Sequence, residues 1–397
     1  MSKYELGFGY SERFEDEAPL IDNIFDRFQH TYIVGKTGMG KSSLMERMAL
    51  YDMKHGNAVI YLDPHGNSAQ KLYSLAPNKD NTIFISIDRP KVINPLDKGG
   101  DIFEVINEFV QIMDNLTQLS SSNVASTVFM KEILRNAILI IDKDSNKNIK
   151  YLVDFLMYEE ERAKVNIKDE DLKRYWKEFD EKEKWSRYPK NKEKIETAKR
   201  VASRLQEISS GKMKDFIIGR NELDISEVIE KGTAVIVDTS HMSENARIYL
   251  SNLIVYSILS YCEFSKAENK PCLIYVDEFQ IVVSKWFSDL LARARHRQIG
   301  FTLAHQSLEQ IQRNILSTIL GNAHTMITFR TGIDEADRMS KVYDIKSRDL
   351  INLEKYCAWL RIGTKNMLIQ CYPPLKDDNP IAPPITPTYN FLDDTWF

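Results

Sequence analysis

Residues 32–44 read YIVGKTGMGKSSL, and they limit the possible folds of this 397-residue chain more than any other stretch. An apolar run ends there in a glycine-rich loop, and a helix-forming stretch follows. Residues 35–42 fit G-x-x-x-x-G-K-[ST], a loop whose N–H groups curl around a β-phosphate. In this pattern Lys41 reaches the β- and γ-phosphate oxygens, Ser42 binds Mg²⁺, and the positive helix end adds attraction. The sequence therefore predicts a strand, a phosphate-binding loop and a helix in succession.

The residues expected to bind the nucleotide form the loop itself: Gly35, Lys36, Thr37, Gly38, Met39, Gly40, Lys41, Ser42 and Ser43. A switch GTPase is the competing interpretation, because DPHG at 63–66 matches D-x-x-G and residues 78–80 resemble the start of N-K-x-D. However, Asp80 comes one place early, and the two motifs leave no room for a helix and a strand between them. We therefore reject that interpretation and expect ATP and Mg²⁺ as the ligands.

Short apolar runs recur along the chain and predict its fold class. They lie at residues 31–35, 58–63, 81–87, 233–238, 272–277, 299–304 and 324–330. Each run is continuous rather than alternating and is rich in Ile, Val and aromatic residues, as in strands buried on both faces of a parallel sheet. Helical stretches separate several of these runs, and this alternation predicts an α/β fold with a mostly parallel central sheet.

Residues 99–220 interrupt that alternation with helical spacing and a long charged stretch of mixed sign. Such a stretch, with scattered Leu, Trp and Tyr, is typical of amphipathic helices with solvated outer faces. We therefore predict an inserted all-α subdomain over 99–220 between two parts of the α/β core, 1–98 and 221–372. A hairpin is expected near the end of the core, and a Pro-rich tail is expected over 373–397.

The net charge of −4 excludes a protein that coats nucleic acid with its whole surface, so any DNA contact must be local. The four cysteines form no C-x-x-C pair, which predicts reduced thiols rather than a zinc site or a disulfide framework. The first residues are polar and acidic, unlike a signal peptide, and no apolar stretch is long enough to span a bilayer. We expect a cytoplasmic protein without direct membrane insertion.

A second acidic site follows the apolar run in LIYVDEFQ, residues 273–280. Asp277 falls at the carboxyl end of a predicted buried strand, where an α/β sheet places its ligands. We expect Asp277 to hold the Mg²⁺ shell with Ser42. Glu278 comes next and is expected to polarise the attacking water. This pair predicts nucleotide hydrolysis rather than nucleotide binding alone.

A third element comes after the acidic pair. A predicted helix carries Arg293, Arg295 and Arg297, and the strand after it ends at Gln306. A strand-terminal glutamine can bond the γ-phosphate or the lytic water and so report the state of the nucleotide. Arg293 and Arg297 are four residues apart and share a helix face, which is a candidate DNA contact, while Arg295 points elsewhere. A solvated face is the alternative for these arginines.

This constellation resembles the HerA/FtsK superfamily of P-loop DNA-pumping ATPases, and within it the branch of conjugative coupling proteins and type IV secretion ATPases. The resemblance extends over most of the chain, and the order of the segments is more specific than any one motif. The segments are RFQHTYIVGKTGMGKSSL, YLDPHG, INPLD, LDISEVIEKGTAVIVDTS, LIYVDEFQ, ARHRQIGFTLAHQSLEQI and GNAHTMITFRTGIDEADRMSK. It implies a RecA-like core, a homo-oligomeric ring, usually a hexamer, and DNA in the central channel.

By the same resemblance Lys41, Ser42, Asp277, Glu278 and Gln306 match the family's catalytic positions. Motors of this kind complete the site with an arginine from the next subunit, for which Arg330 is our first candidate and Arg295 the second. Some relatives carry N-terminal membrane helices, a β-barrel or a winged helix, and from this sequence we expect none of these. Recruitment by a partner is then expected: a relaxase, a nuclease or a membrane channel. An ATPase for protein secretion or assembly and a nucleotide-gated scaffold are the alternatives to a DNA motor.

Overall fold

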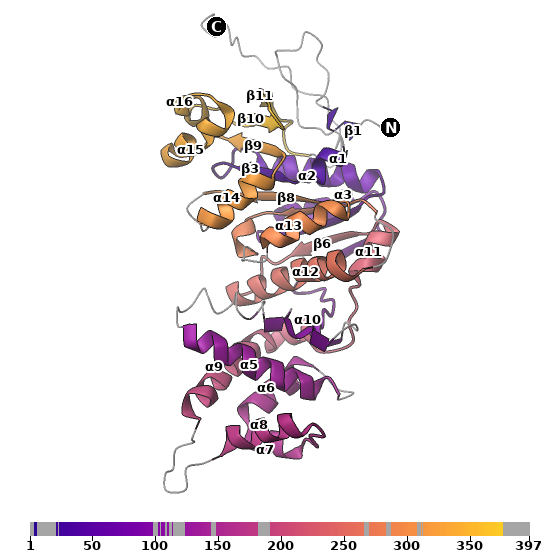
Figure 1. Cartoon of the computed structure of the whole chain (residues 1–397). Coiled ribbons are helices and arrows are strands. Elements are labelled where there is room, and N and C mark those ends of the chain that lie inside the picture. Colours follow the sequence, from indigo (N-terminus) through magenta and orange to yellow (C-terminus); the bar gives the residue numbers. More distant parts are fainter. Residues whose placement is uncertain are drawn as a thin grey trace, which may run out of the picture.

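The fold is described from a computed structural model of the chain. The residues it describes are 4–5, 21–22, 24–97, 102–103, 105–107, 109–110, 113, 124–143, 148–181, 191–265, 270–282, 287–307, 311 and 313–375. A nine-stranded sheet with helices on both faces forms one end, and a group of helices forms the other (Figure 1). Two short strands, β1 (Tyr4–Glu5) and β2 (Ile21–Asp22), pair separately as an antiparallel ribbon.

The central sheet has the strand order β11-β10-β9-β3-β8-β7-β4-β6-β5. Neighbours from β9 to β5 are parallel, whereas β10 pairs antiparallel with both β9 and β11. All the apolar runs predicted as strands are strands, which confirms the α/β class. The bounds are β3 Thr31–Val34, β4 Ala58–Asp63, β5 Thr82–Ile85, β6 Ala234–Asp238, β7 Cys272–Val276, β8 Ile299–His305 and β9 Thr325–Phe329.

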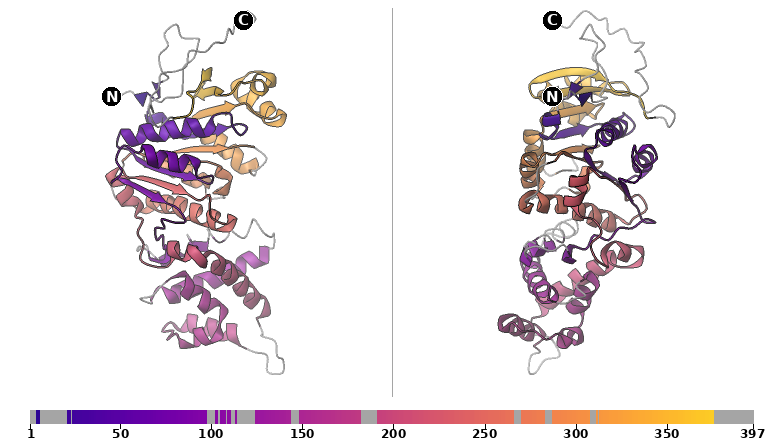
Figure 2. Two further views of the ribbon diagram at one scale, coloured as in Figure 1. Left: turned by 180° about the vertical axis from the view of Figure 1, so that it is seen from behind. Right: turned by 90° about the vertical axis from the view of Figure 1, so that its right-hand side faces the viewer.

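Alternate residues of each central strand enter different cores, and this explains why the strands are apolar throughout. In β4, Ile60 and Leu62 join one buried cluster, while Val59 and Tyr61 join the other. One face is covered by α2 (Lys41–Lys54) and α3 (Asn67–Leu75). The right-hand view of Figure 2 shows that further helices cover the opposite face of the sheet. They are α12 Glu244–Phe264, α13 Phe287–His296, α14 Arg313–Asn322 and α15 Ile333–Tyr343.

The described residues between β5 and β6 that lie within 102–231 are helical or irregular and contain no strand. The described part of the charged stretch forms amphipathic helices, as predicted: α8 buries Trp176 and Phe179, and Arg162 pairs with Asp180 at 2.5 Å. Residues 182–190 of that stretch lie outside the described residues. The group packs on the sheet end through α9 and α12, while the boundaries at 98 and 220 stay predictions. Its helices are α5 Val124–Ile141, α6 Ile149–Met157, α7 Glu159–Lys164, α8 Glu170–Asp180, α9 Lys192–Ile208 and α10 Lys214–Ile217. The next helix, α11 Ile225–Lys231, packs against β4 and α12 at the sheet.

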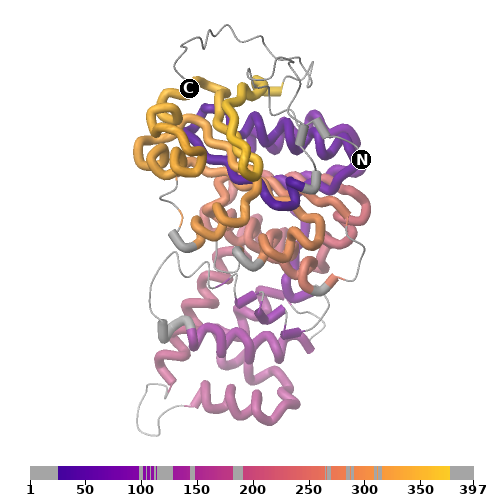
Figure 3. Tube along the Cα trace, turned by 45° about the horizontal axis from the view of Figure 1, so that its top comes forward, coloured from indigo at the N-terminus to yellow at the C-terminus, as the bar shows by residue number. Residues whose placement is uncertain are grey.

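The last part of the core returns to the phosphate loop. After α16 (Ser347–Ile351), β10 (Cys357–Ile362) and β11 (Lys365–Gln370) form the predicted hairpin. Residues 371–375 then run onto α2, where the Arg47 guanidinium donates to the carbonyl of Pro373 at 2.7 Å. Figure 3 shows this yellow C-terminal segment beside the indigo α2. Residues 376–397 of the predicted tail lie outside the described residues.

The four cysteines, Cys262, Cys272, Cys357 and Cys371, are buried and free. Among the described helices, none combines the length and the apolar character needed to cross a membrane.

Candidate nucleotide-binding and hydrolytic site

The phosphate loop joins β3 to α2 and is held by two later segments of the chain. The Lys36 N–H donates to the carbonyl of Arg330 at 2.8 Å, and the carbonyl of Met39 accepts the Tyr356 N–H at 2.9 Å. Gly40 has φ +120°, and a Cβ there would lie 2.8 Å from Cδ1 of Tyr356. Only glycine therefore allows both this backbone and this close approach.

Lys41 is the first residue of α2 and is 6% exposed. Its ammonium donates to the carbonyl of Gly35 at 2.6 Å and to that of Lys36 at 3.3 Å, so it lies against the inside of the loop. Burial lowers the pKa of Lys41, while the carboxylates of Asp277 and Glu278 act in the opposite direction. A partly desolvated cation held inside a loop fits the β- and γ-phosphates of a nucleotide.

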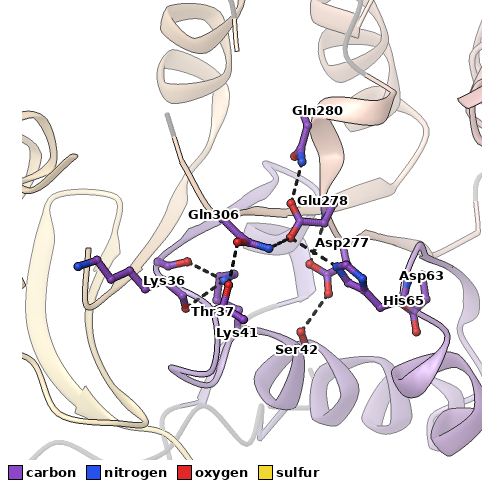
Figure 4. A network of polar contacts seen from close by, with 11 residues as sticks. Lys36, Thr37, Lys41, Ser42, Asp63, His65, Asp277, Glu278, Gln280 and Gln306 are labelled. Carbon is purple, nitrogen blue, oxygen red and sulfur yellow. Dashed lines mark hydrogen bonds and ion pairs between the residues drawn. The ribbon is translucent and has the colours of Figure 1, made fainter. Parts of the chain in front are cut away.

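The two predicted metal ligands meet across the site. The Ser42 hydroxyl donates to Oδ2 of Asp277 at 3.0 Å (Figure 4). Burial raises the pKa of Asp277, helped by the nearby Glu278 and Asp63 and opposed by the hydrogen bond from Ser42. A buried carboxylate whose ionised form is disfavoured is well suited to a cation, which would compensate its charge. These two oxygens fit Mg²⁺, which takes few protein ligands and completes its shell with phosphate and water.

Glu278 follows Asp277 and has an uncommon backbone conformation. Its φ is +50°, and a non-glycine residue in this left-handed region costs of order 1 kcal/mol. The carboxylate is held from both sides, by Gln306 Nε2 at Oε1 and by Gln280 Nε2 at Oε2, at 2.7 Å for the latter (Figure 4). The side chain is only 10% exposed. A carboxylate fixed in this way can orient a water molecule and accept its proton.

Gln306 connects Glu278 to the phosphate loop. Its side chain donates to Glu278 and accepts a hydrogen bond from the Thr37 hydroxyl at 2.8 Å. The contact arises because β8 pairs directly with β3, with His305 opposite Val34, so both strands end at the same edge. The sequence predicted Thr37 as a loop residue, whereas its hydrogen bond to Gln306 follows only from this strand order.

Sequence reasoning missed His65, which lies at the mouth of the site. Its Nε2 is 3.7 Å from Oε1 of Glu278, and its side chain is 58% exposed. Asp63 shapes the turn that positions it, accepting the N–H of His65 at 2.8 Å and that of Ala69 at 2.9 Å. The signal was present in DPHG, which we weighed as a GTPase motif and assigned to the family resemblance without giving His65 a role.

These groups surround one cavity of about 230 Å³ that spans the phosphate loop. Lys355 and Tyr356, which precede β10, also line the cavity. No sequence motif indicates this, because the two residues are distant from the phosphate loop in the sequence. Gly35, Lys36 and Met39 belong to the loop without lining the cavity. The residues that line it are Thr37, Gly38, Gly40, Lys41, Ser42, Ser43, His65, Asp277, Glu278, Gln306, Lys355 and Tyr356.

The predicted arginines lie outside this cavity. Arg293 pairs with Glu263 at 3.0 Å, and Arg297 donates to the carbonyl of Cys262 at 3.1 Å. Both therefore contact the C-terminal end of α12. Arg295 is exposed on α13, whereas Arg297, predicted on the same helix, follows its last residue, His296. Arg330 touches the phosphate loop of its own chain through its carbonyl. The roles of these four arginines stay predictions.

The sequence matches two families. The family described as "Helicase HerA, central domain" matches residues 24–258, more than half of the chain. The family described as "TraM recognition site of TraD and TraG" matches residues 271–343, which include the acidic pair and Gln306. A comparison with curated protein sequences finds no match.

Solved structures share the fold at low sequence identity. The plasmid coupling protein TrwB in complex with ADP and Mg²⁺ has a TM-score of 0.69 and 13% identity, covering 89% of this chain and 88% of that one. VirB4 of Thermoanaerobacter pseudethanolicus has a TM-score of 0.64 and 14% identity, covering 92% and 95%. With the family matches, these likenesses show that the chain belongs to the helicase HerA family, in the HerA/FtsK superfamily and beside the conjugative coupling proteins.

Proposed function

We propose that this protein is an ATP-hydrolysing motor that forms a ring and moves DNA in conjugative or other mobile-element transfer. One observation carries the hydrolytic part of this proposal. Glu278, a buried carboxylate, is bonded to Gln306, which in turn is bonded to Thr37 of the phosphate loop. A protein that only bound nucleotide would not need a carboxylate fixed at this place.

Each site residue has a role in this proposal. Lys41 and the N–H groups of the loop bind the phosphates, and Ser42 and Asp277 hold Mg²⁺. When bound, Mg²⁺ neutralises charge on the phosphates. Glu278 orients the attacking water and accepts its proton. Gln306 keeps Glu278 in place and passes the state of the site to the rest of the sheet.

Ring assembly and the DNA cargo rest on the family and not on a contact in this chain. A ring would allow Arg330, or else Arg295, to act on the site of the next subunit. TrwB is a plasmid coupling protein by its own description, and a coupling role here would require a partner such as a relaxase, a nuclease or a membrane channel. The net charge of −4 agrees with DNA contacts confined to a channel.

An ATPase that drives protein secretion or assembly, without DNA in the channel, is the second candidate. The likeness to VirB4 over 92% of this chain favours it. A scaffold that binds nucleotide and turns over little is the third, and a catalytic Glu278 argues against it.

The test is ATP hydrolysis by the full chain, measured with and without single- and double-stranded DNA. We expect DNA to stimulate turnover and the particle mass to rise to that of a ring with a non-hydrolysable analogue. Glu278→Gln should bind ATP but lose at least about a hundred-fold in turnover, and Lys41→Ala should lose binding. Glu230→Gln, on an exposed glutamate of α11, is the matched control. The DNA motor would be contradicted if DNA did not change the rate of ATP hydrolysis and the protein stayed monomeric with the analogue.

A further inference from the structure

The segment between α16 and β10 closes one side of the nucleotide cavity. Tyr356 has φ +66°, a conformation rare for a residue with a side chain. Its N–H donates to the carbonyl of Met39 at 2.9 Å, and its own carbonyl accepts the N–H of Cys371 at 2.7 Å. The residue is thus fixed between the phosphate loop and the strand end after the hairpin.

The ring of Tyr356 lies directly on the phosphate loop. Its Cδ1 would be 2.8 Å from a Cβ at Gly40, so the missing side chain of Gly40 makes room for the ring. Tyr356 is partly exposed and lines the cavity together with Lys355. The ammonium of Lys355 lies 5.0 Å from the centroid of this ring. An aromatic face and a positive charge therefore meet at one wall of the site.

This wall is separate from the hydrolytic groups. Glu278 and Gln306 bond each other and Thr37, and Asp277 bonds Ser42. Tyr356 makes its main-chain contacts with Met39 and Cys371 instead. If the terminal phosphate lies beside Glu278, the ribose and base must leave the loop elsewhere, and the wall formed by Tyr356 offers an aromatic surface for them.

We propose that Tyr356 binds the nucleobase by stacking and that Lys355 adds a positive charge beside the ribose and α-phosphate. This rests on the proposed function only in taking a nucleoside triphosphate as the ligand. Stacking uses the face of the base and not its edges, so it tolerates different bases. ATP and GTP should therefore depend on Tyr356 to a similar degree.

Equilibrium binding to the full chain, in the presence of Mg²⁺, separates a base contact from support of the loop. The ligands are ATP, GTP and inorganic tripolyphosphate, which has the phosphates but no base. Tyr356→Leu keeps bulk over Gly40 without an aromatic face, and Tyr356→Phe keeps the face. We expect Tyr356→Leu to weaken ATP and GTP about ten-fold, to leave tripolyphosphate unchanged, and Tyr356→Phe to bind like the wild type.

The controls make each outcome decisive. Tyr158→Ala removes an exposed tyrosine in the helical part and should change no affinity. Equal weakening of ATP and tripolyphosphate by Tyr356→Leu would show that Tyr356 only supports the loop, and unchanged ATP affinity would show that the ring makes no contact. Either result overturns the proposal. Failure of Lys41→Ala to weaken all three ligands would instead count against the nucleotide site itself.

Discussion

The Thr37 hydroxyl donates to Oε1 of Gln306 at 2.8 Å, across 269 residues of sequence. Gln306 uses its amide to donate to Glu278, so the phosphate loop and the candidate general base share one intermediary. A change in the loop on nucleotide binding would therefore alter the position of Glu278. We therefore propose that Gln306 positions Glu278 and that Thr37 fixes the orientation of Gln306.

We predict that Thr37→Val lowers turnover more than it weakens nucleotide binding. The substitution keeps the shape of the side chain and removes one hydrogen bond, worth about 1 kcal/mol, or about five-fold in rate. Steady-state ATP hydrolysis gives kcat and KM, and we expect kcat to fall while KM changes little. Thr37→Ser, which keeps the hydroxyl, should restore turnover.

The coupling of the pair is measured with the double variant Thr37→Val with Gln306→Ala. Because both residues act through one hydrogen-bond chain to Glu278, the combined loss should be smaller than the product of the separate losses. Independent effects that multiply would show that Thr37 does not act through Gln306.

Much of the site could be predicted because its residues carry local signals. Lys41 and Ser42 belong to a motif with a fixed geometry, and Asp277 ends a continuous apolar run. The carboxyl ends of parallel strands meet at one edge of a sheet, so their proximity follows from the fold class. The observed hydrogen bond between Ser42 and Asp277 lies where this reasoning places it.

The rest depends on strand order and on long-range packing. His65 reaches Glu278 because β4 lies beside β7 in the sheet, although two other strands, β5 and β6, and many helices separate them in sequence. Tyr356 reaches Gly40 because the antiparallel β10 joins the sheet next to β9. Nothing in the sequence around Arg297 indicates its hydrogen bond to the carbonyl of Cys262 at the end of α12. No spacing in the sequence encodes such contacts.

We predict that His65 positions Glu278, since its Nε2 lies 3.7 Å from Oε1 of that carboxylate. His65→Ala should lower kcat by about ten-fold while nucleotide affinity and the melting temperature change little, because the side chain is largely exposed. His65→Gln, which keeps a polar side chain of similar length beside Glu278, should recover part of the loss. The matched control is His55→Ala, because His55 caps the end of α2 that lies away from the phosphate loop. An unchanged kcat in His65→Ala would contradict this role.

We predict that the fold loses stability as the pH falls from about 6.5 to about 4, with His30 as one cause. Its Nε2 bonds the carbonyl of Leu291 at 2.7 Å, and its Nδ1 accepts the Phe301 N–H at 3.2 Å, so the neutral ring is satisfied. Burial lowers the pKa of His30 to about 4. Below the pKa that His30 has in the unfolded chain, about 6.5, the unfolded chain binds a proton that the folded chain does not. This lowers the free energy of unfolding by up to about 3 kcal/mol.

The measurement is urea unfolding at several pH values between 4 and 7.5. His30→Gln should flatten the dependence of the free energy of unfolding on pH, although it lowers stability at pH 7.5. His55→Gln, on an exposed histidine, is the matched control. Burial likewise lowers the pKa of His305 to about 4, so part of the slope should persist in His30→Gln. A slope identical to that of the wild type would contradict the assignment to His30.

The last prediction concerns the arginine that completes the site. Arg330 follows β9, and its carbonyl accepts the N–H of Lys36 at 2.8 Å, so its main chain adjoins the phosphate loop of its own subunit. Arg330→Ala removes the guanidinium and leaves this main-chain contact in place. We therefore expect normal ATP affinity with turnover reduced at least about a hundred-fold, since such an arginine stabilises charge on the transferred phosphoryl group.

Mixing separates action on the next subunit from action within one chain. Arg330→Ala subunits keep Glu278, and Glu278→Gln subunits keep Arg330. In a mixed ring some sites combine an intact Glu278 with an intact Arg330 from the neighbour, so turnover should rise above that of either variant alone. Arg295→Ala, mixed in the same way, tests the second candidate. If Arg330 acts on its own site, no mixed ring contains an intact site and turnover stays at the level of the variants, because each subunit then lacks one of the two groups.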